Sequence, residues 1–345
     1  MSTFAVTVNQ IDKVWAHPNA DRLSLCQVSG FSYQFVTGKD EYKVGDTVLF
    51  FPPDALLPEP VITKMGLIGK LSGKNKNRIK TVRLRDQISE GIVARPEVFF
   101  TDDSWKTMTA DQVTAALGVT KYEPPEIPCH AGKLIHMPNG VAVYDIEGAE
   151  RYLSVVDVLM DQPVYLSEKM EGTNFWLSIL NGEIGIGTHR HEIKPIEGFE
   201  HDFFKAARLH KLDDFIRKIE QPGKRVTLRG ELCGHGVQSN IYKLKEYTVF
   251  AFDIMVDGVY LNAEEFIRVC GENQVKTVPT ISIGVTLREF LNGQTIREAS
   301  NGKSLLADTA REGFVVKPMI EQKHPDIGRL IIKMRSPSYL AKSNL

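Results

Sequence analysis

Three prolines within five residues divide this chain of 345 residues into two parts. Pro124, Pro125 and Pro128 each fix the backbone angle φ and remove a hydrogen-bond donor, so no helix or sheet can continue through them. Hydrophobic residues make up 42% of the sequence, and a chain of this length can bury two separate cores. We therefore predict two domains, residues 1–120 and 141–345, joined by a proline-rich linker over residues 121–140.

The N-terminal part is predicted to be a small β-barrel. Short β-prone runs, such as residues 23–28 and 47–51, are separated by Gly, Asp and Pro about every ten residues. Many short strands at this spacing are typical of small closed barrels. Residues 17–23, His-Pro-Asn-Ala-Asp-Arg-Leu, resemble a turn of OB-fold modules that bind transfer RNA. Turn chemistry alone also accounts for them, and we expect His17 to be structural.

The most basic window of the chain lies in this first part. It holds seven cations and no acidic residue: Lys70, Lys74, Lys76, Arg78, Lys80, Arg83 and Arg85. Gly73 and Asn75 predict that the window begins as a flexible loop. A run of charge is usually a solvated face, but a basic loop on an OB-like barrel suits the phosphate backbone of a nucleic acid. We expect four of these residues to bind it: Lys74, Lys76, Arg78 and Lys80. The net charge of −1 does not argue against this, because the distribution of charge matters more than its sum.

Lys169 is the candidate nucleophile. It lies between two β-prone runs, with Gly172 closing a turn, so it is exposed at a strand end. A lysine amine attacks only when neutral, and its ordinary pKa of about 10.4 leaves roughly one molecule in a thousand neutral near pH 7. Nearby cations would lower that pKa. Lys333 and Arg335 lie two residues apart on a predicted strand, share a face, and would supply this charge if they meet Lys169.

Taken alone, a Lys-x-Glu-Gly turn is common by chance, but an ordered set of short segments follows it. These are Thr188-His189-Arg190, Leu228-Arg229-Gly230-Glu231, Phe250-Ala251-Phe252-Asp253-Ile254, Glu312-Gly313-Phe314-Val315-Val316-Lys317 and Lys333-Met334-Arg335. In this order the chain resembles the covalent nucleotidyltransferases, which are the polynucleotide ligases and messenger RNA capping enzymes, over roughly residues 144–336. The run from Glu168 to Asn174, residues 234–240 and the Phe-Ala-Phe-Asp-Ile run resemble RNA ligases most.

The resemblance implies roles for individual residues. Those implied in catalysis are Lys169, Lys333 and Arg335. Those implied in nucleotide binding are Glu168, Asn174, Arg190, Glu231, Phe252 and Lys317, with Asn174 and Arg190 on the ribose and Phe252 stacked on adenine. Those implied in holding Mg²⁺ or Mn²⁺ are Glu171, Glu231 and Glu312. The last motif is usually Lys-x-Lys, and an arginine at 335 keeps the charge but cannot donate its proton.

The reaction implied by the resemblance is ATP-dependent RNA ligation. Lys169 would attack the α-phosphorus of ATP, AMP would pass to an RNA 5′-phosphate, and a 3′-hydroxyl would then displace AMP and seal the nick. Most related enzymes carry an OB domain after the catalytic domain, whereas here the barrel comes first and ten residues follow Arg335. This order resembles the Naegleria and Deinococcus type of RNA nick-sealing ligase. Two alternatives remain open, a GTP-using capping-type guanylyltransferase and a non-catalytic OB-fold RNA-binding protein.

The expected fold class is α+β. An N-terminal OB-like barrel precedes a ligase-type nucleotidyltransferase domain built on antiparallel sheets with flanking helices. Within it we predict a type I′ hairpin at Asn181-Gly182, a helical core stripe over residues 203–219, and a strand over 225–228 that ends at Gly230-Glu231.

Four scattered cysteines argue against a disulfide framework and a structural zinc site, and the adjacent pair Cys129-His130 is taken as coincidence. The sequence has no apolar run of membrane-spanning length and no signal peptide at its N-terminus. We therefore expect an intracellular, cytoplasmic monomer whose partner is RNA rather than a membrane.

Overall fold

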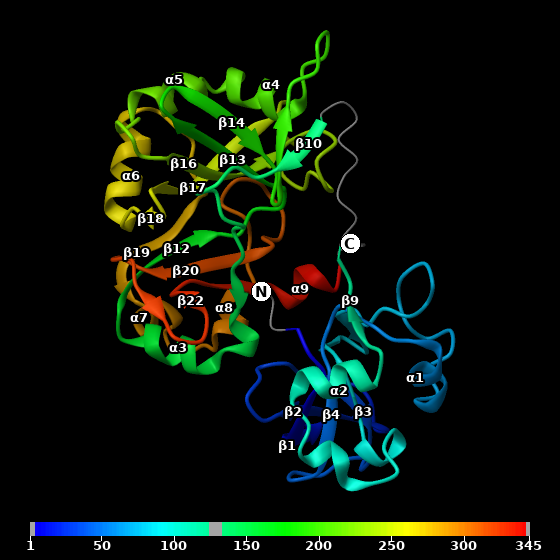
Figure 1. The fold of residues 1–345 in the computed structure, drawn as a ribbon. Helices are drawn as coiled ribbons and strands as arrows, with labels where there is room; N and C mark the ends of the chain where they lie inside the picture. The colour runs from blue at the N-terminus through cyan, green and yellow to red at the C-terminus, as the bar shows by residue number, and fades with distance from the viewer. Residues whose placement is uncertain (1–3, 124–132, 343–345) are drawn as a thin grey trace. The chain divides into compact units, whose positions relative to one another are not determined.

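The structure is a computed structural model that describes residues 4–123 and 133–342. It divides into two compact units (Figure 1). Unit 1 comprises Met1–Glu126, Glu150–Leu153 and Pro337–Leu345, and unit 2 comprises Ile127–Ala149 and Ser154–Ser336. Two short segments, 150–153 and 337–342, thus pack with the first unit, although the sequence prediction placed them in the second domain. The three prolines of the linker and Cys129 lie outside the described residues.

Unit 1 contains a five-stranded antiparallel sheet that is nearly closed into a barrel. Its strands are, in sheet order, β3 (Phe35–Gly38), β2 (Leu23–Val28), β1 (Thr7–Ala16), β4 (Thr47–Phe51) and β8 (Ile92–Ala94). The two edges meet where the N–H of Glu90 donates to the carbonyl of Gln34 at 2.8 Å. The predicted OB-like barrel is confirmed.

The barrel sheet buries apolar side chains on both faces. One cluster, with Phe35, Val48 and Phe50, fills one face. The other, with Leu49 and Phe51, packs against short elements around the barrel. These elements are α1 (Glu59–Lys64), α2 (Ala110–Ala116), β5 (Ala55–Leu56), β9 (Thr120–Lys121), β6 (Val82–Leu84), β7 (Gln87–Ser89), η1 (Pro96–Val98) and η2 (Asp103–Lys106). Successive residues of β4 alternate between the two clusters, as the period of a strand requires.

Unit 2 is built on two sheets. The larger has, in order, β10 (Lys133–His136), β15 (His191–Lys194), β14 (Glu183–Gly187), β13 (Thr173–Leu180), β16 (Val226–Cys233), β17 (Thr248–Val256) and β18 (Val259–Tyr260), all antiparallel. Its apolar face is covered by α4 (Asp202–Leu209), α5 (Leu212–Lys218) and α6 (Ala263–Glu272) (Figure 1). We call its other face the polar face of the larger sheet.

The smaller sheet of unit 2 has the order β11 (Glu147–Gly148), β23 (Ile332–Arg335), β20 (Gly313–Pro318), β12 (Pro163–Glu168) and β19 (Thr280–Thr286). Its pairs are antiparallel except β11 with β23. Unit 2 also contains α3 (Leu153–Met160), except its first residue, with α7 (Leu287–Leu291), α8 (Ile296–Ser300) and the hairpin of β21 (Lys323–His324) and β22 (Gly328–Arg329). The last helix, α9 (Pro337–Leu340), belongs to unit 1, and η3 (Ala149–Arg151) spans the boundary between the units. Antiparallel sheets with flanking helices match the predicted α+β class, which is confirmed.

Three local predictions are tested by these elements. The hairpin at Asn181-Gly182 is confirmed, and φ values of 50° and 79° at these residues are those of a type I′ turn. The helical stretch over 203–219 is two helices, because Lys211 adopts a left-handed φ of 52° between α4 and α5. Most of its apolar stripe is core, but Leu209 is exposed.

The strand that carries Glu231 is longer than predicted. β16 continues through Gly230 and Glu231 to Cys233, so Glu231 lies within a strand and not at its end. The pairing of β16 with β17 shifts register between Arg229 and Gly230. Arg229 pairs with Asp253 and Gly230 with Ala251, so Phe252 is the extra residue of a bulge in β17. This bulge changes the direction of the β17 side chains beside Glu231.

Candidate active site

The polar face of the larger sheet carries a row of polar side chains. Asn174 pairs with Glu231 across β13 and β16. Trp176 pairs with Arg229, and Arg229 pairs with Asp253 on β17. Residues directly opposite each other in a sheet project to the same side, so these side chains share the face that α4, α5 and α6 leave uncovered.

The smaller sheet presents four cations on one face. The backbone N–H of Lys169 donates to the carbonyl of Gly313 at 3.0 Å, and Gly313 pairs with Arg335. Lys333 pairs with Val315, and Lys317 pairs with Tyr165. Because positions two apart along a strand share a face, Lys169, Lys317, Lys333 and Arg335 project to the same side.

Lys169 pairs with a carboxylate. Its Nζ lies 2.6 Å from Oε1 of Glu312, which directly precedes β20. Lys333 and Arg335 were expected to be its nearest charged neighbours, whereas the amine contacts a carboxylate. Nucleophilic attack by this amine requires its contact with Glu312 to be released.

Glu231 belongs to the same charged cluster. Burial, with a smaller contribution from the charge of Glu312, raises the pKa of Glu231 to about 8 against the opposing charges of Lys169 and Lys333. Two carboxyl groups and two cations are therefore close enough to influence one another's charge. Hard oxygen donors of this kind suit a divalent cation.

Gly172 shapes the turn that exposes Lys169. A Cβ atom at this position would lie 2.6 Å from the carbonyl oxygen of Leu232 and 2.7 Å from Cγ of Glu231. Only a residue without a side chain lets the turn approach β16 so closely. The glycine of the Lys-x-Glu-Gly run is thus needed for close approach as well as for the bend.

Glu171 holds this turn to the segment that follows β16. Its Oε1 accepts a hydrogen bond from the N–H of Ser239 at 2.8 Å, and its own N–H donates to the hydroxyl of Tyr242 at 2.7 Å. Within residues 4–123 and 133–342, no group of three His, Cys, Asp or Glu side chains is arranged to hold a metal ion. The roles predicted for Glu171, Glu231 and Glu312 in holding a divalent ion therefore stay a prediction.

Two buried acceptor atoms near Lys169 lack hydrogen-bond partners. They are Oδ1 of Asn174 and Oε1 of Glu168, whose other oxygen accepts from the N–H of Leu305 at 2.8 Å. A buried acceptor without a partner is costly, so both are suited to donors on a bound molecule. Phe252 is half-buried against the cluster that includes Met170, and its ring centroid lies 4.8 Å from that of Tyr144.

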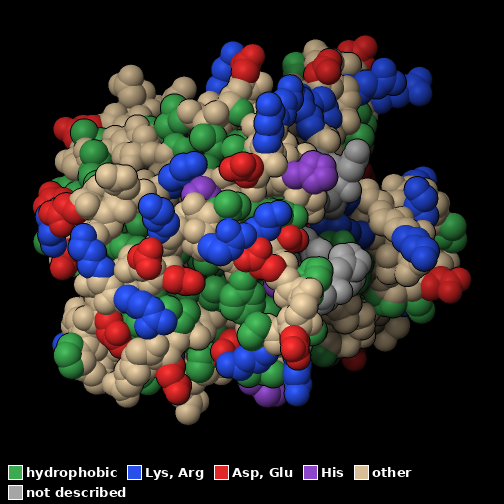
Figure 2. Space-filling model, turned by 90° about the horizontal axis from the view of Figure 1, so that it is seen from above, with side chains coloured by type: hydrophobic (Ala, Val, Ile, Leu, Met, Phe, Trp, Pro, Cys, Tyr) green, Lys and Arg blue, Asp and Glu red, His purple; other side chains and the backbone are tan. Residues whose placement is uncertain are grey.

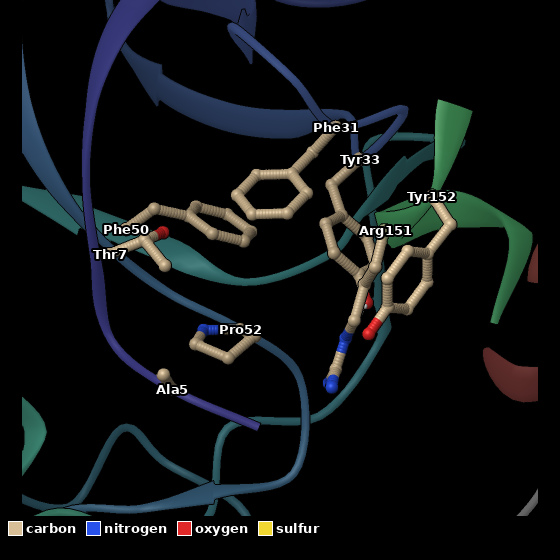
Figure 3. A pocket seen from close by; sticks show the side chains of 8 residues that line it. All are labelled: Ala5, Thr7, Phe31, Tyr33, Phe50, Pro52, Arg151 and Tyr152. Carbon is tan, nitrogen blue, oxygen red and sulfur yellow. Dashed lines mark hydrogen bonds between the residues drawn. The ribbon is translucent and has the colours of Figure 1, made fainter. Parts of the chain in front are cut away.

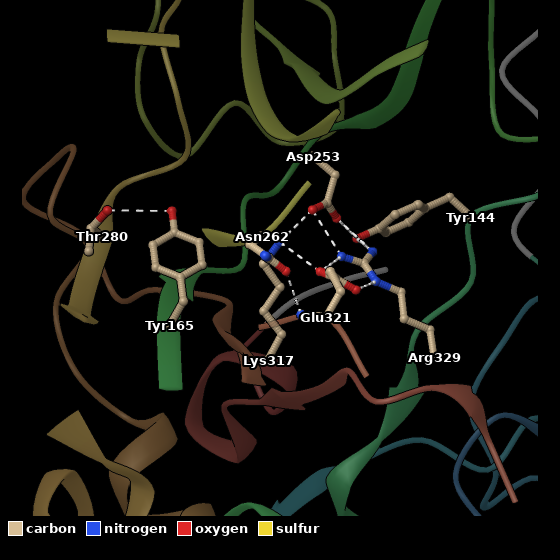
Figure 4. Close-up of polar contacts among 8 residues, drawn as sticks. All are labelled: Tyr144, Tyr165, Asp253, Asn262, Thr280, Lys317, Glu321 and Arg329. Carbon is tan, nitrogen blue, oxygen red and sulfur yellow. Dashed lines mark hydrogen bonds and ion pairs between the residues drawn. The ribbon is translucent and has the colours of Figure 1, made fainter. Parts of the chain in front are cut away.

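An ion network that the sequence prediction missed lies beside these residues (Figure 4). Lys317 is 3% exposed, and its Nζ lies 2.5 Å from Oδ1 of Asp253 and 3.3 Å from Oε1 of Glu321. Arg329 donates to both carboxylates, at 2.7 Å to Asp253 and 2.5 Å to Glu321. Tyr144 donates to Asp253 as well.

The network fixes the charge of Asp253. Although burial alone would raise the pKa of this carboxyl, Arg329 and Lys317 hold it well below its ordinary value. Lys317 was predicted to lie near nucleotide phosphates, but its described partners are these carboxylates. A sequence signal was present, because a charged residue inside the apolar run 248–256 must find a partner when buried.

Arg190 lies in the loop between β14 and β15, where it is exposed. Its neighbour His189 approaches Asp145 at 3.1 Å, so the loop is tied to the segment before β11. The predicted role of Arg190 in binding the ribose therefore stays a prediction.

Comparison with known proteins identifies the family. A family model for RNA ligase matches residues 162–335, just over half of the chain and the whole set of elements from β12 to β23. The chain belongs to the RNA ligase family. A second model, for an OB-fold domain, matches residues 5–96 of this RNA ligase.

Solved structures of Naegleria gruberi RNA ligase share the fold. A variant with ATP and Mn has a TM-score of 0.80 at 23% identity and covers 99% of both chains. A variant with AMP and Mn has a TM-score of 0.79 at 24% identity, and a structure with PPi has 0.78 at 24%, each covering 98% of both chains. These identities establish similarity of fold.

One curated protein matches a part of the ligase. The phenylalanine–tRNA ligase beta subunit of Bdellovibrio bacteriovorus is 38% identical over 95 residues, which is 26% of this chain and 12% of that protein. Because the match spans so little of that protein, it carries no assignment of activity.

The residues of the basic window differ in their exposure and partners. Lys74 and Lys76 are exposed. Arg78 lies 2.6 Å from Asp54 and its guanidinium lies 3.5 Å from the ring centroid of Tyr122. Arg78 therefore has a structural pairing that the sequence, which showed no acid within the window, did not predict. Burial and the charge of Arg78 lower the pKa of Lys80.

Acidic and basic side chains are interspersed on the face of the RNA ligase drawn in Figure 2. The described part of the chain contains no helix long and apolar enough to cross a membrane. Three of its four cysteines, Cys26, Cys233 and Cys270, are described, and each is buried with a free thiol.

Proposed function

We propose that this RNA ligase uses ATP to seal a nick between an RNA 3′-hydroxyl and a 5′-phosphate. The observation that carries the proposal is the cluster around Lys169. A lysine at a strand end contacts Glu312, lies in the same charged group as Glu231 and Lys333, and shares a sheet face with Arg335. Family membership favours this proposal over a capping guanylyltransferase and over a non-catalytic RNA-binding protein.

The donors around Lys169 fit a nucleotide with a divalent cation. Structures of Naegleria gruberi RNA ligase hold ATP or AMP together with Mn. In this chain, Glu231 and Glu312 would hold Mg²⁺ or Mn²⁺, since a cation favours the charged carboxylate that burial otherwise disfavours. When bound, the ion supplies positive charge to the phosphates. Oδ1 of Asn174 would accept from a ribose hydroxyl, and Phe252 would stack on the base.

The first step is attack by the Lys169 nitrogen on the α-phosphorus of ATP. The nitrogen–phosphorus bond forms, the bond from the α-phosphorus to the pyrophosphate oxygen breaks, and the amine loses its proton to solvent. Lys333 and Arg335, on the same face as Lys169, stabilise the charge that develops on the phosphates. The residues supply positioning and charge neutralisation more than proton transfer.

Two further transfers complete the proposed reaction. AMP moves from Lys169 to the 5′-phosphate of the RNA, which frees the lysine and forms an RNA adenylate. The 3′-hydroxyl oxygen of the adjoining strand then attacks that phosphate, and AMP leaves. The exposed cations Lys74 and Lys76 would contact the RNA backbone during these steps.

The decisive experiment is covalent labelling. Purified protein is incubated with Mg²⁺ and either ATP or GTP labelled at the α-phosphate, and the adduct is mapped by mass spectrometry. We expect AMP on Lys169 with ATP, and no adduct in Lys169→Met. The absence of an adduct in the folded wild-type protein would refute the proposal, and labelling by GTP alone would favour the capping reaction. Sealing of nicks with RNA or DNA on each side then defines the substrate.

A further inference from the structure

Unit 1 contains a cavity lined mainly by aromatic rings (Figure 3). Its volume is about 200 Å³, and its walls include Phe31, Tyr33, Phe50, Pro52, Arg151 and Tyr152. The ring centroids of Phe31 and Phe50 are 5.6 Å apart, and those of Tyr33 and Phe50 are 5.3 Å apart. Tyr33 and Phe50 are buried, whereas Phe31 is half-buried and leaves part of its ring accessible.

The wall that contains Arg151 is held in place by the barrel. The Nε–H of Arg151 donates to the hydroxyl of Tyr33 at 3.1 Å, and the N–H of Ser32 donates to the carbonyl of Glu150 at 3.0 Å. The segment 150–153 and the barrel belong to the same unit. The cavity is therefore a formed feature of unit 1 rather than a gap between separate bodies.

Its size and chemistry limit what it can bind. Binding sites are typically concave and lined mainly by apolar and aromatic side chains with a few polar groups that orient the ligand. At about 30 Å³ for each water, the space equals roughly seven waters, which suits one flat heterocycle and is below the range of larger ligands. Arg151 is the charged residue among those lining it, and its cation complements a phosphate.

We infer that this cavity binds one unstacked base of the RNA substrate, with Phe31 as its accessible stacking ring and Arg151 beside the adjoining phosphate. Base stacking on aromatic rings tolerates any base, because each base has a π-face. The inference rests on the proposed function for its choice of ligand, since an RNA ligase must bind RNA.

The test uses the full-length protein and nicked RNA duplexes in which one nucleotide at a time is made abasic. At one position, loss of the base should weaken binding to the wild-type protein by about 5- to 150-fold, the range expected for one stacking contact. Phe31→Leu keeps apolar bulk without the ring, so it should bind the intact and abasic strands equally at that position. Phe31→Trp should retain the preference.

Phe99→Leu is the matched control, because Phe99 is another half-buried phenylalanine of unit 1 and lies outside the cavity. It should keep the wild-type preference, and thermal melting of each variant checks the fold. The inference would be overturned if no abasic position weakened binding, or if Phe31→Leu kept the preference for the intact strand. A cavity that binds a protein partner instead would also give equal binding of intact and abasic strands at every position.

Labelling of Lys169 with ATP alone separates the two proposals. We expect Phe31→Leu to form the lysine adduct at the wild-type rate, since this step needs no RNA. An unlabelled protein that still shows the abasic preference would refute the proposed function and leave the base site standing. A protein that is labelled at Lys169 but shows no abasic preference would keep the proposed function and refute the base site.

Discussion

Glu231 shows how one residue acquires properties that its sequence context does not reveal. It lies within β16, next to a bulge and between the charges of Lys169, Glu312 and Lys333. Burial places its pKa near 8, so at neutral pH the carboxyl is mostly protonated when no cation is bound. The residue is suited to bind a divalent ion because the ion restores the charge.

This raised pKa predicts a pH dependence of stability. A carboxyl with a folded pKa near 8 and an ordinary value of 4.5 stabilises the fold at low pH, and that contribution is lost as pH rises from about 4.5 through 8. In metal-free buffer, Glu231→Gln should therefore raise the melting temperature by a few degrees at pH 8.5 and by less at pH 5.5. Differential scanning calorimetry measures this, with the exposed Glu183→Gln as control. An equal effect at both pH values would contradict the prediction.

Arg335 is the position at which this chain departs from the usual Lys-x-Lys. If its role is charge alone, Arg335→Lys should change the rate of Lys169 labelling by less than about tenfold. Arg335→Ala should reduce that rate by about 100-fold or more, as is typical when one group that stabilises a developing charge is removed. Single-turnover labelling measures both. An Arg335→Lys variant as slow as Arg335→Ala would show that the planar guanidinium is required.

At the scale of elements, two contacts position the chemistry. The turn after β12 approaches β16 at Gly172, and the ion network joins β17, β20 and β22 through Asp253, Lys317 and Arg329. The first sets the place of Lys169, and the second connects the two sheets of unit 2. Neither contact alone positions all of the site's side chains.

The close approach at Gly172 predicts that adding one methyl group there reduces the reactivity of Lys169. Gly172→Ala should reduce the rate of Lys169 labelling by at least about tenfold, because its Cβ would lie 2.6 Å from the Leu232 carbonyl and displace the turn. Gly271→Ala in α6 is the control, since nothing lies within 4 Å of a Cβ there and a helix favours alanine. Wild-type labelling in Gly172→Ala would show that the turn adapts.

The ion network predicts that Lys317 acts mainly in stability. Lys317→Met should lower the free energy of unfolding by about 3 kcal/mol or more, because removing one partner leaves buried carboxylates less compensated. Urea denaturation measures the loss, and Asp253→Asn should show a similar loss. If Lys317 instead served the phosphates, its variant would keep its stability and lose labelling activity.

At the scale of the whole molecule, a net charge of −1 coexists with a strongly basic window, residues 70–85. The catalytic motifs and the barrel are matched by separate family models, over residues 162–335 and 5–96. The exposed cations of the basic window belong to the barrel unit, and the proposed nucleophile, Lys169, belongs to unit 2. Binding of RNA and formation of the lysine adduct are therefore expected to respond to different substitutions.

The basic window predicts a change in salt dependence. Replacing Lys74 and Lys76 by alanine should weaken RNA binding and reduce the slope of log affinity against log salt by about one for each lost phosphate contact. Lys106→Ala, which removes another exposed lysine of unit 1, should leave the slope unchanged. Fluorescence anisotropy over a salt series measures the slopes. Arg78→Ala should chiefly reduce stability, because Asp54 would lose its partner.

The sequence alone predicted the elements whose signals are local. The hairpin at Asn181-Gly182, the strand over 47–51 and the shared face of Lys333 and Arg335 follow from turn residues and from the period of a strand. The family resemblance likewise rested on short runs in order, and the RNA ligase match confirms it.

Tertiary structure alone decided which side chains meet. The contact of Lys169 with Glu312, the pairing of Arg78 with Asp54 and the burial of Lys317 beside Asp253 join residues that lie far apart in the chain. Local patterns carry no information about such pairs, because register, bulges and sheet packing decide which charges come together. Those long-range contacts determine whether a charged residue binds a substrate or stabilises the fold.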